Sequence, residues 1–119
     1  MLVIQKNQWA ALEQSSFNRF VNTMIAVLRR RFAEESSAAT DEQLREFVES
    51  QIERAAAYDI SDRQCVRAFI EIAGSYGRNF DVQLDWARAI LNRRILSQRA
   101  KIDWLEEYAM FLGLRNEQL

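Results

Sequence analysis

The sequence predicts an all-α fold, a compact single-domain bundle of about five helices over residues 1–119. Proline is absent and only three glycines occur, so no stretch resembles a hinge or a linker. Apolar residues recur at intervals of three and four along most of the chain, which is the spacing of one helix face. No stretch alternates apolar and polar residues, and Asn-Gly and Asp-Gly turns are absent, so strands are not expected.

The first helix is expected from about Lys6 to Phe32. Residues 24–28 are apolar on all sides, which predicts a central place in the bundle for this half of the helix. A short polar break at residues 36–40 should follow. Whether the opening residues 1–4 pack on the bundle or pair as a strand stays open. The apolar positions of this helix are Trp9, Leu12, Phe17, Phe20, Val21, Met24, Ile25, Leu28 and Phe32.

The second helix is expected to open with a capping box. Thr40 would be the N-cap residue, and Gln43 three positions later would return the hydrogen bond. The apolar stripe that follows should end near Tyr58.

Ser61 and Gln64 repeat the capping pattern and predict the start of a third helix that runs to Tyr76. Gly77 is then the residue expected to close the helix in a left-handed conformation.

The segment Arg78 to Asp85 is predicted to be a loop, followed by a short fourth helix from Trp86. The fifth helix should be capped by Ser97 and should end at Gly113.

The composition excludes several kinds of chemistry. There is no histidine and only one cysteine, Cys65, so a histidine-based triad, a Cys/His zinc site and an internal disulfide are all impossible within this sequence. We expect Cys65 to behave as a small apolar core residue, since no base that could activate it is recognisable. No catalytic residue, metal or cofactor is therefore predicted.

The apolar arc of the fifth helix is wider than one neighbouring helix requires. At 100° per residue, Trp104, Tyr108 and Phe111 extend the arc to about half of the circumference. These three aromatic residues are the predicted apolar contacts for a protein partner. The alternative is that the helix lies in a groove and buries both flanks.

Charge is uneven although the formal net charge is only -1. Acidic residues dominate positions 34–53, whereas positions 86–101 hold bases and no acid. The two regions could steer a partner, pair with each other, or remain solvated. The candidate steering residues are Arg93, Arg94 and Arg99 in the basic region, or Glu42, Glu46 and Glu49 in the acidic one.

Asp81 and Asp85 are the remaining acid/base candidates. They flank a loop beside an aromatic residue, where a metal or substrate could be held, but the expected role is helix capping, with Asp85 just before Trp86. No Ca²⁺-type alternation of oxygen ligands is present.

Arginine-rich stretches such as 29–31 could in principle contact phosphate, but a sequence pI near 5.5 argues against nucleic acid as the partner. The opening apolar residues are too few for a signal-peptide core, and charged residues interrupt every longer apolar stretch. We therefore expect a cytoplasmic protein with no membrane contact.

An ordered set of landmarks runs through nearly the whole chain. The most specific is the run Tyr76-Gly77-Arg78-Asn79-Phe80-Asp81 with Trp86. The landmarks before it are residues 1–4, Gln8, Phe17, Phe20, Leu28, Ile52, Ala55, Tyr58 and Ile60. The landmarks after it are Ile90-Leu91, Lys101-Ile102-Asp103 and Leu105. This set resembles the small helical proteins encoded beside type VI secretion effectors, spike proteins and adaptors in Gram-negative bacteria. One departure is Asp59, where a glycine would be expected, although aspartate tolerates the left-handed conformation.

The resemblance implies a non-enzymatic, co-chaperone-like accessory that binds an effector or its adaptor for loading. Some such neighbours are instead immunity proteins that neutralise a co-encoded toxin, and this alternative stays open. A small nucleic-acid-binding regulator is a weaker alternative. A homodimer is also possible, because an exposed aromatic helix edge suits a two-fold interface.

Overall fold

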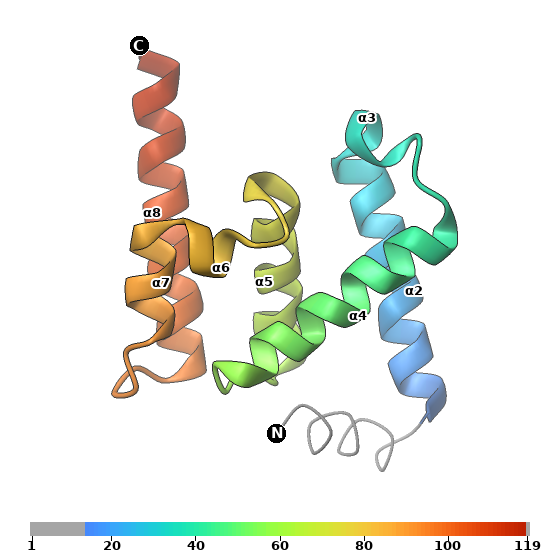
Figure 1. Cartoon of the computed structure of the whole chain (residues 1–119), viewed down its shortest axis with the longest axis horizontal. Helices are drawn as coiled ribbons and strands as arrows, with labels where there is room; N and C mark the ends of the chain where they lie inside the picture. The colour runs from blue at the N-terminus through green and yellow to red at the C-terminus, as the bar shows by residue number, and fades with distance from the viewer. Residues whose placement is uncertain (1–13, 119) are drawn as a thin grey trace.

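The computed structural model describes the backbone of residues 14–118 and the side chains of residues 14–112. Within that part of the chain every regular element is a helix (Figure 1). Two of the helices have only four residues, and five are longer, so the predicted all-α fold with about five helices is confirmed. The elements are α2 (Gln14–Arg31), α3 (Ala33–Ser36), α4 (Asp41–Ala57), α5 (Arg63–Tyr76), α6 (Phe80–Gln83), α7 (Asp85–Leu91) and α8 (Gln98–Gln118).

The helices form a flattened bundle with principal extents of 46 × 38 × 20 Å. In Figure 1, α5 lies between α2 on one side and the α7–α8 pair on the other, and α4 crosses α2 and reaches α5. The first half of α8 packs against α5 and α7, whereas its C-terminal half extends beyond the ends of its neighbours. A long stretch of α8 surface is consequently left without a covering helix.

The core collects the predicted apolar stripes of the helices. The large side chains with less than 2% exposure include Met24 from α2, Phe69 and Ile70 from α5, Phe80 from α6 and Leu105 from α8. Burial of each such side chain stabilises the fold by about 1.5–3 kcal/mol. In the central part of α2, Met24 is buried as predicted for residues 24–28, but Ala26 is exposed. That stretch is therefore only partly enclosed.

The capping prediction for α4 is confirmed at both of its hydrogen bonds. The Gln43 amide donates to Thr40 Oγ1 at 3.1 Å, and the Thr40 amide donates to Gln43 Oε1 at 2.9 Å. The predicted Ser97 cap is also present, since the Ala100 amide donates to Ser97 Oγ at 3.1 Å.

The C-terminus of α4 closes in a Schellman arrangement. The Ile60 amide donates to the Ala55 carbonyl at 2.9 Å and the Asp59 amide donates to the Ala56 carbonyl at 3.0 Å. Asp59 has φ 64°, the left-handed conformation that its side chain was expected to tolerate. Ile60 is buried just beyond it, which anchors the turn in the core.

The predicted start of the third helix is wrong by one residue. The N-cap of α5 is Asp62, whose carboxylate accepts a hydrogen bond from the Cys65 amide at 3.2 Å. The Ser61 amide is instead bound by the side-chain oxygen of Gln98 at 2.9 Å. Gln98 Oε1 also accepts a hydrogen bond from the Asp62 amide at 2.8 Å, so the first residue of α8 joins the start of α5 at two positions.

The segment 78–85 is not a plain loop, because it contains the four-residue helix α6. Gly77 closes α5 with φ 108° and ψ 155°, so its predicted positive φ is confirmed, although in an extended rather than a helical left-handed conformation. Phe80 is fully buried, and Trp86 is half-buried.

Three further boundaries differ from the sequence-based expectation. Helix α2 ends at Arg31 and the short α3 follows it; the expected residues 6–13 of this helix, and residues 1–4, lie outside the described part. Helix α7 begins at Asp85, one position early. Helix α8 continues through Gly113 to Gln118, since one glycine inside a helix costs only about 1 kcal/mol relative to alanine and the residues after it favour helix.

Candidate protein-binding surface on the last helix

Helix α8 buries one face and leaves its aromatic flank in solvent. Ile102 and Leu105 are buried against the bundle, while Trp104, Tyr108 and Phe111 are 51%, 42% and 61% exposed. We call these three side chains the α8 aromatic patch. The structure thus brings the predicted partner-contact residues together, and the alternative in which α8 buries both flanks is wrong.

Two exposed apolar side chains near the patch were not predicted. Met110 is 63% exposed and, with the patch and Glu107, surrounds a hollow of about 490 Å³. Ile95, in the turn before α8, is 92% exposed. Ile95 is followed by Leu96 in the turn, so no local pattern marks it as exposed. Met110 was missed because its register places it outside the predicted arc, on another side of α8.

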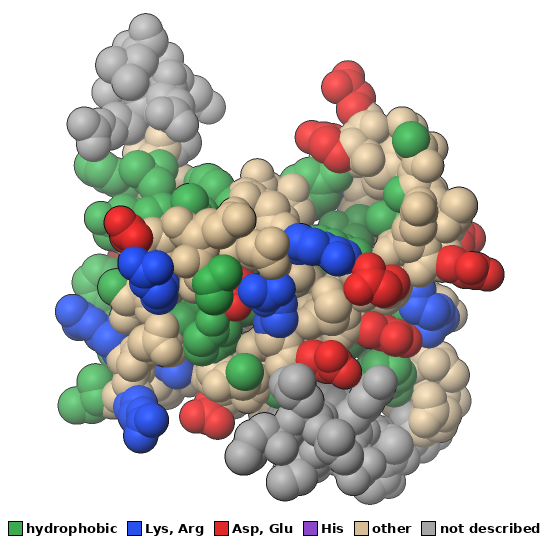
Figure 2. Space-filling model, in the orientation of Figure 1, with side chains coloured by type: hydrophobic (Ala, Val, Ile, Leu, Met, Phe, Trp, Pro, Cys, Tyr) green, Lys and Arg blue, Asp and Glu red, His purple; other side chains and the backbone are tan. Residues whose placement is uncertain are grey.

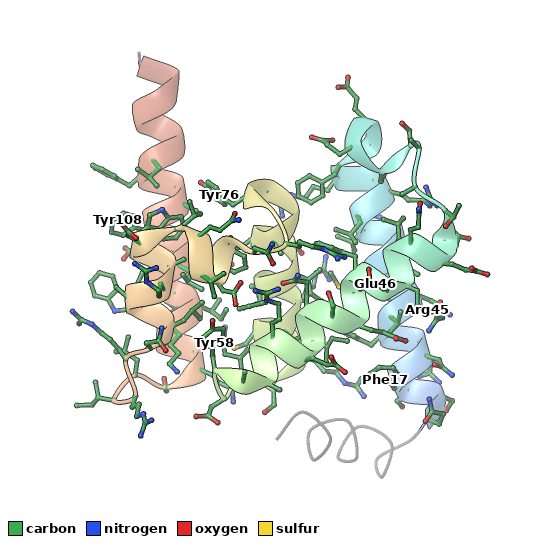
Figure 3. The ribbon with its side chains drawn as sticks, in the orientation of Figure 1. Phe17, Arg45, Glu46, Tyr58, Tyr76 and Tyr108 are labelled. Carbon is green, nitrogen blue, oxygen red and sulfur yellow. The ribbon has the colours of Figure 1, made fainter. Side chains whose placement is uncertain are left out.

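A series of aromatic rings holds the patch in place. Tyr76 meets Trp86 edge-on, with ring centroids 5.6 Å apart and an interplanar angle of 80°. Trp86 in turn stacks on Tyr108. The Tyr76 hydroxyl donates to the Ala109 carbonyl at 3.3 Å, and Figure 3 shows Tyr76 on α5 facing toward Tyr108 on α8. The patch is therefore part of a preformed surface supported by α5 and α7.

The predicted basic residues lie close to this end of the molecule. Arg93 and Arg94 are exposed in the turn between α7 and α8, and neither forms an ion pair within the described residues. Arg99, on the first turn of α8, is exposed and donates to Gln64 Oε1 at 3.2 Å. Their positive charge is available to a partner.

The predicted acidic residues are engaged to different degrees. Glu46, labelled on α4 in Figure 3, pairs with Arg78 at 2.8 Å, and Glu49 pairs with Arg45 at 3.5 Å. Glu42 is exposed at the start of α4. Figure 2 shows that most acidic side chains of that face gather over α3 and α4, away from α7 and α8. The acidic and basic regions thus do not neutralise each other across the fold.

Asp81 is not a helix cap but the centre of a buried polar cluster. Its carboxylate is 2% exposed and lies 3.0 Å from Arg54 Nη2, and it accepts a hydrogen bond from the Tyr58 hydroxyl at 2.8 Å. Arg54 also donates to Asn79 Oδ1 at 2.8 Å. Burial and the Asp81 carboxylate raise the pKa of Tyr58 to about 12. The cluster fastens α6 to α4.

Asp85 is also not the predicted cap. Leu84 occupies the N-cap position of α7 without a side-chain hydrogen bond, and Asp85 pairs with Arg88 at 2.7 Å in solvent. The two aspartates therefore do not form a common site. Within the described residues, no group of three Cys, Asp or Glu side chains is arranged to hold a metal ion.

Cys65 is 1% exposed, as predicted for a small core residue. Burial, with a smaller contribution from the Asp62 carboxylate, raises the pKa of its thiol. The thiol form is favoured, so the nucleophilic thiolate is scarce at neutral pH.

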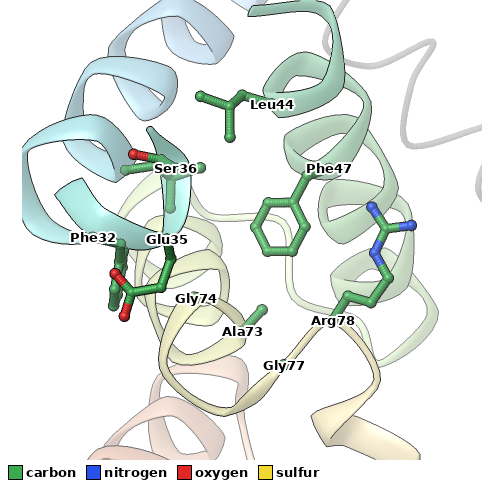
Figure 4. A pocket seen from close by; sticks show the side chains of 10 residues that line it. Phe32, Glu35, Ser36, Leu44, Phe47, Ala73, Gly74, Gly77 and Arg78 are labelled. Atoms are coloured by element: carbon green, nitrogen blue, oxygen red, sulfur yellow. The ribbon is translucent and has the colours of Figure 1, made fainter. Parts of the chain in front are cut away.

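An apolar hollow of about 310 Å³ opens between α2, α3, α4 and α5 (Figure 4). Phe32 and Phe47 face it, and Glu35 and Arg78 lie at its edge. A Cβ at Gly74 would stand 2.6 Å from the Phe32 ring, so glycine makes room for this ring. No local sequence pattern predicts the hollow, because residues from α2, α3, α4 and α5 line it together.

No helix in the described part of the chain has the length and apolar character needed to cross a membrane. Comparison with known proteins finds no matching family model, no matching curated protein and no matching solved structure.

Proposed function

We propose that this chain is a non-enzymatic, co-chaperone-like accessory of a bacterial type VI secretion system that binds an effector, or its adaptor, for loading. The secretion context rests on the resemblance carried by the Tyr76–Asp81 run with Trp86. The protein-binding role is supported by a single observation, the exposure of the α8 aromatic patch on an otherwise packed helix.

Exposed aromatic side chains on a rigid support are suited to anchoring a partner. Aromatic residues dominate the binding energy of many interfaces, and a preformed surface loses little conformational entropy when it binds. Tyr108 is held by Trp86, and Trp104 lies one helical turn before it. Arg93 and Arg94 would raise the association rate of an acidic partner.

Binding can be tested by co-purification with the products of the neighbouring effector operon. We expect the wild-type chain to retain an effector or its adaptor and the Trp104→Ala/Phe111→Ala double variant to bind at least about 100-fold more weakly. Val82→Ala is the matched control, because Val82 is also exposed and apolar but lies on α6. Recovery of none of these products by the wild-type chain would refute the proposal.

A toxicity assay separates the accessory role from immunity. An accessory is required for delivery of the effector and leaves the toxicity of the free toxin domain unchanged. Rescue of cells that express the free toxin domain would instead identify an immunity protein.

A further inference from the structure

The α8 aromatic patch has flanks of opposite charge. Tyr108 stacks on Trp86, so α7 lies on one side of the patch, and the turn with Arg93 and Arg94 leads from the end of α7 to the start of α8. Asp103 and Glu107 precede Trp104 and Tyr108 by one position, which rotates them 100° around the helix to the other side. Both acids are exposed and form no ion pair within the described residues.

A strip with one basic and one acidic flank is complementary to a second copy in only one relative direction. If two copies face each other with parallel α8 helices, a two-fold axis along the helices sets each basic flank against the acidic flank of the other copy. If the helices run antiparallel, basic faces basic and acidic faces acidic. Charge complementarity therefore selects the parallel pair.

We propose that two copies of this chain pair through the α8 aromatic patch, with parallel α8 helices related by a two-fold axis. Trp104, Tyr108 and Phe111 of each copy then pack on their counterparts, and Arg93 and Arg94 face Asp103 and Glu107. The pair covers the aromatic side chains that the bundle leaves exposed. The same surface would bind an effector or adaptor, so pairing of two copies regulates access to it. Only this regulatory role rests on the proposed function.

The pairing is tested by sedimentation equilibrium of the purified full chain, without any partner, over a concentration series. We expect a monomer–dimer equilibrium for the wild type and a monomer for Trp104→Glu. Arg93→Glu/Arg94→Glu and Asp103→Arg/Glu107→Arg should each raise the dimer Kd by about tenfold, since each change acts twice in a two-fold pair. The combined quadruple variant should return to within about threefold of the wild-type Kd, because it exchanges the two flanks.

The controls keep charge and folding separate from pairing. Glu34→Arg/Glu35→Arg changes the net charge as much as the Asp103/Glu107 reversal but lies on α3, so it should leave the Kd unchanged. Circular dichroism should show the same helical content in all variants. A wild-type chain that stays monomeric at every concentration overturns the proposal. A dimer that neither charge reversal weakens overturns it as well, because that is the result expected for an antiparallel pair. Co-purification with effector-operon products is measured separately, so failure of one proposal is distinguishable from failure of the other.

Discussion

The indole ring of Trp86 lies nearly parallel to the phenol ring of Tyr108, at an interplanar angle of 6° and a centroid distance of 5.2 Å. The same indole meets Tyr76 edge-on. One ring series therefore joins α5, α7 and α8 and ends at an exposed surface. It fixes the orientation of α7 against α8 and the position of the α8 aromatic patch.

The Trp86–Tyr108 stack should contribute measurable coupling to stability. In a double-mutant cycle with Trp86→Leu and Tyr108→Leu, we expect a coupling free energy of about 0.5–1.5 kcal/mol, since stacked aromatic pairs contribute this much beyond area burial. Urea unfolding of the four proteins measures it. Additive effects of the two substitutions would show that the rings are only neighbours.

Loss of the Asp81 carboxylate should destabilise the fold far more than loss of Asp85. Asp81→Ala leaves the partly buried Arg54 without its ion-pair partner and removes the acceptor of the Tyr58 hydroxyl, so we expect a loss of about 2–4 kcal/mol. Asp85→Ala breaks an exposed pair with Arg88 and should cost less than about 0.5 kcal/mol. Thermal or urea unfolding compares them, and equal effects would remove the structural role assigned to the buried cluster.

The contrast between these two aspartates shows what sequence reasoning could and could not predict. Helix periodicity and the Thr40 capping box depend on residues within one or two turns of each other, and both were predicted correctly. The wide apolar arc of α8 was recognised in the same way, but the arc alone left open whether its aromatic flank is buried or exposed. Asp81 finds its partners 23 and 27 positions earlier in the chain, at the C-cap Tyr58 and at Arg54 on α4. Nothing in the local pattern distinguishes it from an aspartate that caps a helix.

The hollow between α2, α3, α4 and α5 was unpredictable for the same reason. In the sequence Phe32 and Phe47 are ordinary members of apolar stripes, and only the packing of these helices places their rings at one opening. The α5 cap lies at Asp62 and not at Ser61, and Gln98 of α8 accepts hydrogen bonds from the amides of both residues. Contacts between segments far apart in the chain bring these groups together, and local propensity does not predict such contacts.

Alkaline unfolding should report the environment of Tyr58. Its pKa is about 12 in the folded chain against 10.0 for the unperturbed group, so the fold favours the neutral phenol. That contribution is complete below pH 10 and is lost as the pH rises through 12. Solvent screening of this half-buried group holds the loss to about 1 kcal/mol. Between pH 10 and 12 the wild type should lose this much more stability than Tyr58→Phe, and parallel pH profiles would contradict the assignment.

Asp59 offers a substitution that should stabilise the protein. It closes α4 with φ 64° and is exposed, so its Cβ bears a steric cost that glycine avoids. We expect Asp59→Gly to raise the free energy of unfolding by about 0.5 kcal/mol, after the greater freedom of glycine in the unfolded chain is subtracted. Asp59→Ala keeps the Cβ without the polar side chain and should lower it by about 1 kcal/mol. Urea denaturation at neutral pH measures both, and a stability order with alanine above glycine would show that the Schellman turn does not constrain this residue.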